Sequence, residues 1–287
     1  YGMTLYLSPS YHLALDQHTA DQLYARVPDF GGYMMKLGSE KQNGDPRPPM
    51  VNRIADTLAP HGGLCLVRGF VYGNYRYTPE PYRHLIPHDI FAPEDGQYRE
   101  NVVLVPKGSA GDWDYSAPIP AMDGVMKETL SGSELVIDKG FPCSWVEKWK
   151  WWLDQDSYRS GPGSFNKSSV HCIMGVAMVR PQASWGDSPL NMVNYYGLGR
   201  LAWNPDRSLD EIYHEWIVQT FGSAPQVLDT VNRILFMSDD VARKLYLYRG
   251  YRGIWIDKGD KNMVENKTPY AITPQGIGPA SKTLQKR

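Results

Sequence analysis

The sequence predicts an α/β protein in which a portion of a (β/α)8 TIM barrel is followed by a mainly α-helical C-terminal domain. Two observations support this fold class. Short segments that are almost wholly apolar alternate with segments of helical periodicity, which indicates a parallel sheet buried on both faces. From about residue 190 onward the periodicity is helical. We therefore expect the barrel portion at residues 1–188 and the helical domain at residues 189–287.

The barrel portion is expected to begin with a strand at residues 1–8 and a helix at residues 15–27, whose apolar residues share one face. A second helix, at residues 48–63, starts with prolines and ends at paired glycines. The remaining strands are read from their apolar runs, at residues 31–38, 64–72, 100–108, 133–140 and 171–179. These strands and helices follow one another as β/α units do.

The C-terminal region contains three further helical segments, at residues 190–203, 208–222 and 224–248. Ser208 and Glu211 have the spacing of a capping box, which marks the start of the second segment. The segment WVEKWKWWLDQD, at residues 145–156, also has helical spacing, so we expect some of its tryptophans in the core.

Composition narrows the choice of partners. The 287 residues carry 30 basic and 31 acidic side chains, for a formal net charge of −1. This balance does not favour a polyanion, so we expect no nucleic-acid partner. No apolar run approaches the roughly 20 residues that cross a bilayer, so we expect no membrane partner.

Cysteines and sequons bear on the cellular compartment. Cys65, Cys143 and Cys172 form no CxxC pair and are widely spaced, so we expect neither a disulfide framework nor a zinc site. Asn166 and Asn266 lie in glycosylation sequons, Asn-Lys-Ser and Asn-Lys-Thr. The sequence does not decide the cellular location of the protein, and the two sequons slightly favour an extracellular one.

Charged side chains follow several of the predicted strands. Lys36 and Glu40 end one strand, Arg68 interrupts the next, and Lys107 and Asp112 follow a third. The strand after these ends in Asp138 and Lys139. The carboxyl ends of parallel barrel strands converge on one face, so these groups are expected to share a pocket. Basic side chains there would hold an acidic substrate, while carboxylates would transfer protons.

Each of these residues also has a structural interpretation. A lysine after a strand is commonly a solvated loop residue. Arg68 lies in the apolar run LCLVRGFVY, where a charged group is seldom buried without a partner. Its partner could be a substrate carboxylate or a side chain in a structural salt bridge.

The chain resembles the family-67 glycoside hydrolases, the alpha-glucuronidases of xylan breakdown. The resemblance covers most of the chain, and one run, GRLAWNP at residues 199–205, is long and specific. The other stretches that carry it are LYLSPSY, RVPDFGGYMMKLGSE, APHGGLCLVRGFVY, DGQYRENVVLVPKG, NYYGLGRLAWNPDRSLDEIYHEW and QTFG.

This resemblance implies a hydrolase that removes (4-O-methyl)glucuronic acid from xylo-oligosaccharides with inversion and without a metal or organic cofactor. Glu40 falls on the family's general acid, and Asp112 on one of two carboxylates that activate water. Lys36, Arg68 and Lys107 match positions that bind the uronate. An inverting glycosidase places its two carboxyl groups about 6.5–9.5 Å apart, which Glu40 and Asp112 on separate strands could supply.

The chain departs from the family pattern at two places. Gly140 stands near the position of the second water-activating carboxylate, and Asp138, two residues away, is an imperfect substitute. Ser116-Ala117 replaces an Arg-Glu pair. These changes leave two alternatives open, an inactive homologue that binds carbohydrate or serves as structure, and a glycosidase for a different uronic acid. Trp113 could stack on a sugar ring in each case.

The start of the chain suggests a longer protein. Residue 1 is Tyr and not Met, and the front of the barrel has no counterpart, so we expect the beginning of the full protein to be missing. A half-barrel exposes sheet edges. We therefore expect a further segment or another chain to complete the barrel, and a homodimer is compatible with this.

Overall fold

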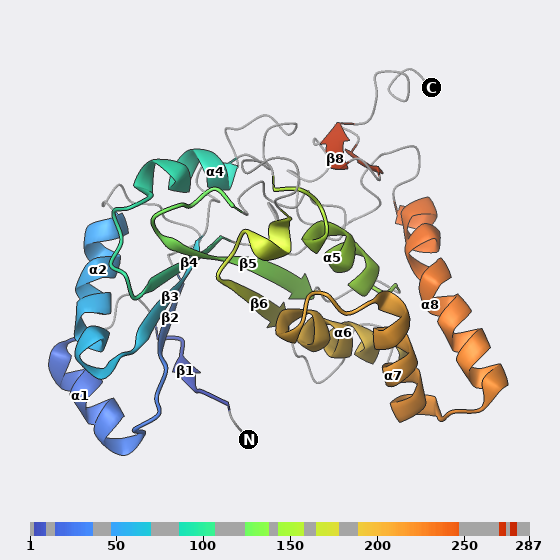
Figure 1. Ribbon diagram of the computed structural model, residues 1–287, viewed down its shortest axis with the longest axis horizontal. Coiled ribbons are helices and arrows are strands. Elements are labelled where there is room, and N and C mark those ends of the chain that lie inside the picture. The colour runs from blue at the N-terminus through green and yellow to red at the C-terminus, as the bar shows by residue number, and fades with distance from the viewer. Residues whose placement is uncertain are drawn as a thin grey trace, which may run out of the picture.

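The computed structural model describes residues 3–9, 15–36, 47–69, 86–106, 124–137, 143–157, 165–177, 189–246, 270–273 and 276–279. Within these ranges, six parallel strands form one sheet in the order β1-β2-β3-β4-β5-β6 (Figure 1). Their bounds are β1 Tyr6–Leu7, β2 Gly32–Lys36, β3 Leu64–Gly69, β4 Val102–Pro106, β5 Leu130–Ile137 and β6 Cys172–Ala177.

The strand order identifies the type of sheet. Each strand pairs with the next one along the chain, and the order never reverses. Because crossover connections between parallel strands are right-handed, an unreversed order places the connecting helices on one face of the sheet. A doubly wound sheet would reverse its order at a switch point. The six strands and their helices are therefore a partial α/β barrel, as the sequence predicts.

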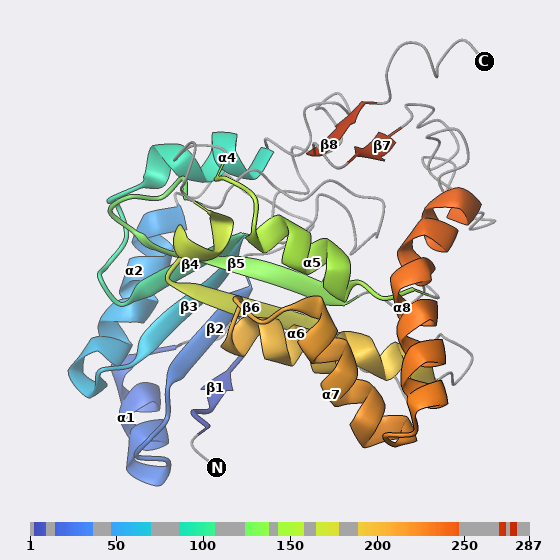
Figure 2. The same cartoon turned by 45° about the vertical axis from the view of Figure 1, so that its right-hand side comes forward.

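A first apolar core lies between β2, β3 and β4 and the helices that cover them. Figure 2 shows the ribbons of two of these helices, α1 and α2, beside the strands. Met35, Val67 and Leu104 are fully buried on the helix side of the sheet. The helices are α1 Gln17–Arg26, α2 Arg47–Leu58 and α4 Ile86–Phe91. The short helix α4 is not predicted from the sequence, because six residues that include Pro87, His88 and Asp89 carry little helical signal.

A second core joins the last strands to the C-terminal helices. Leu135 of β5 packs in one cluster with apolar residues of four helices, among them Trp149, Leu201, Trp216 and Leu235. The helices are α5 Val146–Leu153, α6 Met192–Trp203, α7 Leu209–Phe221 and α8 Pro225–Tyr246. Trp145 and Trp149 are each only 4% exposed, so these two tryptophans belong to the core, as their helical spacing predicts.

The C-terminal region contains the predicted helices and one addition. The Ser208 capping box is present, because its side chain accepts the Glu211 N–H while the Glu211 carboxylate accepts the Ser208 N–H. Two short antiparallel strands, β7 Tyr270–Thr273 and β8 Gly276–Pro279, follow the helices. Strand β8 could not be predicted from the sequence, because Gly276 and Gly278 interrupt any apolar periodicity in it.

The amino ends of the strands are fixed by side chains that bind backbone groups. The Asp95 carboxylate accepts the N–H groups of Lys127, Glu128 and Thr129, which lead into β5. The Asn101 amide donates to the carbonyls of Ala55 and Gly63, which ties the start of β4 to α2 and to the start of β3. These bonds satisfy polar groups that the ladder leaves unpaired.

Gly32 begins β2 with a φ of +128°. A Cβ atom at this position would stand 2.0 Å from the carbonyl oxygen of Leu64. Glycine is therefore required where β2 begins to pair with β3.

All three cysteines are free thiols. Among the described residues, none of the helices is both long and apolar enough for a membrane span. Asn166 is only 1% exposed and donates to the carbonyl of Trp152, so its sequon is not a surface acceptor and gives no support to an extracellular location. Asn266 lies outside the described residues.

Candidate functional site

Two of the predicted site residues lie side by side at the carboxyl ends of neighbouring strands. Lys36 is the last residue of β2, and its register partner on β3 is Arg68. The Lys36 side chain is exposed, while Arg68 is buried at 7% exposure. The sheet thus places two basic residues at one level, at the end of the sheet where barrel sites form.

Arg68 points to the face of the sheet away from the helices. Its neighbour Val67 packs in the core between the sheet and α2, and successive side chains of a strand point to opposite faces. In a barrel this second face is the interior. The face is tightly packed between β4 and β6, because a Cβ atom on Gly132 would meet Val105 Cγ2 at 2.9 Å and Cys172 Sγ at 2.6 Å.

The partner of Arg68 is Glu134, on β5. Arg68 Nε donates to Glu134 Oε2 at 2.5 Å, and Arg68 Nη2 donates to Oε1 at 2.6 Å. The Glu134 side chain is 0% exposed and that of Arg68 is 8% exposed. This is a bidentate, charge-assisted pair that spans β4. Arg68, a charged residue in an apolar run, thus has a side-chain partner within the protein.

Glu134 is not among the site residues that the sequence predicts. It lies within the predicted strand at residues 133–140, but its partner is 66 residues away along the chain. A signal was available, because a second charged residue inside a buried strand requires a partner for the same reason that Arg68 does.

The other predicted site residues lie outside the described residues. They are the two candidate catalytic carboxylates, one candidate uronate ligand and two further candidates, namely Glu40, Asp112, Lys107, Asp138 and Trp113. The departures at Gly140 and Ser116-Ala117 also lie there. Their roles and the separation of Glu40 from Asp112 stay predictions.

Two of the three cysteine thiols are buried in surroundings that favour their neutral form. Burial raises the pKa of Cys65 to about 12, and burial also raises the pKa of Cys172. A thiol reacts through its thiolate, so these two groups are inert near neutral pH. Among the described residues, no three His, Cys, Asp or Glu side chains are grouped so as to hold a metal ion.

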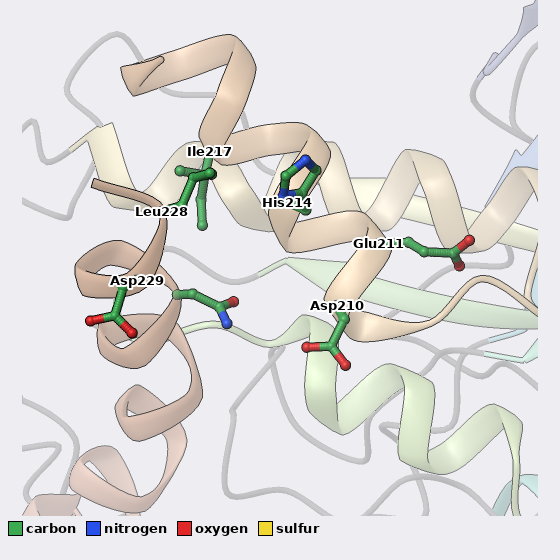
Figure 3. Close-up of a pocket in the computed structure, with 7 residues that line it drawn as sticks. Asp210, Glu211, His214, Ile217, Leu228 and Asp229 are labelled. Atoms are coloured by element: carbon green, nitrogen blue, oxygen red, sulfur yellow. The ribbon is translucent and has the colours of Figure 1, made fainter. Parts of the chain in front are cut away.

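A separate groove of about 490 Å³ lies between α7 and α8 (Figure 3). Asp210 and Glu211 line it from α7, and Asp229 lines it from α8. The Ser208 N–H lowers the pKa of Glu211, whose carboxylate is occupied in the helix cap. His214 and the acidic groups at the groove are exposed, so this groove lacks the enclosed donors and acceptors of the strand-end site.

Comparison with known proteins matches two family models. Residues 13–182 match the glycosyl hydrolase family 67 middle domain, and residues 186–257 match the glycosyl hydrolase family 67 C-terminus. Alpha-glucuronidase A of Emericella nidulans is 31% identical over 242 residues, which cover 75% of this chain and 28% of that protein. Alpha-glucuronidase A of Aspergillus tubingensis is 32% identical over 241 residues, with the same coverage. The chain thus spans about 28% of the length of these relatives.

Proposed function

The chain belongs to glycosyl hydrolase family 67, and on this premise we propose that the protein is a glycoside hydrolase that removes (4-O-methyl)glucuronic acid from xylo-oligosaccharides. The observation that carries the proposal is the placement of Lys36 beside Arg68 at the strand ends. A uronic acid differs from a neutral sugar by its carboxylate, which two adjacent cations can bind.

The proposed reaction is an inverting hydrolysis. Glu40 protonates the glycosidic oxygen of the leaving group, and Asp112 removes a proton from the attacking water on the opposite face of the sugar. Lys36, Arg68 and Lys107 hold the uronate carboxylate, which fixes the anomeric carbon between the two carboxyl groups. Asp138 is a second candidate base and Trp113 a candidate stacking surface for a sugar ring. Every step in this scheme uses a side chain of the protein itself.

We also propose that the partial barrel is completed to a (β/α)8 barrel by a further segment of a longer protein or by another chain. The edge strand β1 supports this, because its apolar neighbours are exposed, Met3 at 79% and Leu5 at 56%. An exposed apolar edge is a template for strand addition. In this arrangement residues 1–188 contribute to the barrel and residues 189–287 form the C-terminal domain.

The proposed function is tested by the release of glucuronic acid from aldouronic acids. We expect the complete protein to release it and Glu40→Ala to lose turnover by at least about a hundredfold, since general acid catalysis contributes about 10²–10⁴ in rate. Glu100→Gln, at an exposed position before β4, is the matched control and should retain full activity.

Two results would count against the proposal. Unchanged turnover in Glu40→Ala would remove Glu40 as the acid. The absence of glucuronic acid release by the unmodified protein would favour the alternative of an inactive carbohydrate-binding homologue.

A further inference from the structure

The guanidinium of Arg68 is held in one orientation by Glu134. A carboxylate that binds Nε and Nη2 together occupies one edge of the planar fork, so it fixes rotation about the terminal bonds of a long side chain. Without Glu134, the Arg68 side chain would sample several rotamers. Binding a ligand would then fix one rotamer, and the lost side-chain entropy would lower the affinity. The pair therefore preorganises Arg68 before any ligand arrives.

The position of the pair indicates more than stability. Buried ion pairs are seldom better for stability than apolar residues of similar volume. A structural role alone thus gives little reason to place Arg68 and Glu134 on the interior face among Val103 and Val105. The pair instead lies level with Lys36, at the strand ends where barrel sites form.

The charges at this level also fit an anionic ligand. Among the residues that the structure describes at this level, Arg68 and Glu134 form a neutral pair, and Lys36 carries a positive charge on the neighbouring strand. Glu134 thereby offsets the cost of burying Arg68 while Lys36 supplies the net attraction for a carboxylate. The guanidinium has N–H donors on both terminal nitrogens. The bonds from Nε and Nη2 to Glu134 fix the directions in which these donors point.

We propose that Glu134 is a positioning residue that orients Arg68 to bind the substrate carboxylate. This inference rests on the proposed function, in which Arg68 binds the uronate. Glu134 acts through Arg68 and does not itself contact the sugar.

The test is the affinity of the full protein for free glucuronate, measured by titration calorimetry, with Glu134→Gln as the main variant. Gln keeps the volume of the side chain but loses one acceptor and the charge. We expect binding about tenfold to a hundredfold weaker, the effect of losing an outer partner or of a displacement of about 1 Å. In turnover assays KM should rise more than kcat falls.

A double-mutant cycle separates positioning from general damage. Because Glu134 acts through Arg68, adding Glu134→Gln to Arg68→Lys should weaken glucuronate binding no further than Arg68→Lys does alone. Glu134→Asp, which keeps the carboxylate on a shorter side chain, should recover part of the loss. If Glu134→Gln does not fold, Glu134→Asp and Arg68→Lys carry the comparison.

Asp95→Asn is the matched control, because it removes a carboxylate acceptor at the opposite ends of the strands. It should lower the melting temperature without weakening glucuronate binding.

Glucuronate affinity in Glu134→Gln equal to that of the unmodified protein would overturn the inference, as would losses that add in the double mutant. Failure of the two proposals is distinguishable: binding that depends on Glu134 without hydrolysis refutes the hydrolase alone, and hydrolysis with unchanged binding in Glu134→Gln refutes the positioning role alone.

Discussion

The two ends of the sheet are built from different interactions. At the amino ends, Asp95 and Asn101 bind backbone N–H groups and carbonyls, so their polar atoms are used to fix the chain. At the carboxyl ends, Lys36 and Arg68 present charge, and Arg68 is bound to another side chain, Glu134. In barrels, residues at the amino ends serve stability and residues at the carboxyl ends serve chemistry.

A carboxylate is fully buried at the carboxyl ends of the strands, whereas the carboxylate at the amino ends keeps contact with water. Asp95 is solvated in part and reaches its three N–H partners from a loop. Glu134 is 0% exposed and forms an ion pair with the buried Arg68. Removing a partner should therefore be far more harmful at the carboxyl ends than at the amino ends.

The largest expected effect is that of Arg68→Ala. It removes the cation that is paired with the buried Glu134 carboxylate, which should lower the free energy of unfolding by about 3–5 kcal/mol. Urea denaturation followed by circular dichroism measures this change. Replacing both partners, as Arg68→Met with Glu134→Leu, should recover much of the loss, and a double variant no more stable than Arg68→Ala would show that the charge is not its cause.

A smaller effect is expected from Asp95→Asn at the other end of the sheet. The carboxamide can accept through one oxygen where the carboxylate accepts through two, so the free energy of unfolding should fall by about 1–3 kcal/mol. Thermal unfolding at pH 7 measures this. A loss as large as that of Arg68→Ala would contradict the contrast between the two ends.

The same carboxylate gives this effect a pH dependence. Burial opposes ionisation of Asp95, but the N–H groups of Lys127, Thr129 and Glu128 outweigh it, so the pKa lies below its ordinary value of 3.8. The folded protein thus binds this proton less readily than the unfolded chain. The stabilisation is complete above about pH 5 and is lost as the pH falls through the folded pKa, so the difference between Asp95→Asn and the unmodified protein should shrink in acid.

The smallest effect is expected away from the sheet, at Ser208→Ala. This change removes the acceptor for the Glu211 N–H at the start of α7 and should lower the free energy of unfolding by about 1 kcal/mol. Chemical denaturation measures it, and glucuronate binding should be unchanged. Weakened binding would show that α7 contributes to the site.

Local signals in the sequence predicted much of this fold. The apolar run at 64–72 became β3, and the capping box placed the start of α7, because both signals depend on neighbouring residues alone. Helix α4 was missed because its six residues carry little propensity. Strand β5 begins at Leu130, earlier than predicted, because Leu130 and Ser131 pair with β4 and Gly132 pairs with β6, although apolar periodicity is weak at these residues.

The site was predictable only in part for a related reason. Arg68 could be identified as a residue that needs a partner, since that follows from its apolar neighbours. The identity of the partner depends on sheet register across β4, which no local pattern contains. Glu40, Asp112, Lys107, Asp138 and Trp113 rest on the family resemblance and lie outside the described residues.

The burial of Asn166 decides which hosts suit production of the protein. Asn166 is 1% exposed, and its amide donates to the carbonyl of Trp152 at 2.8 Å. A host that secretes the chain would expose this triplet to glycosylation before folding encloses it. A glycan on Asn166 would conflict with this burial, so we expect a bacterial host, which leaves the asparagine bare, to yield more folded protein than a host that glycosylates it.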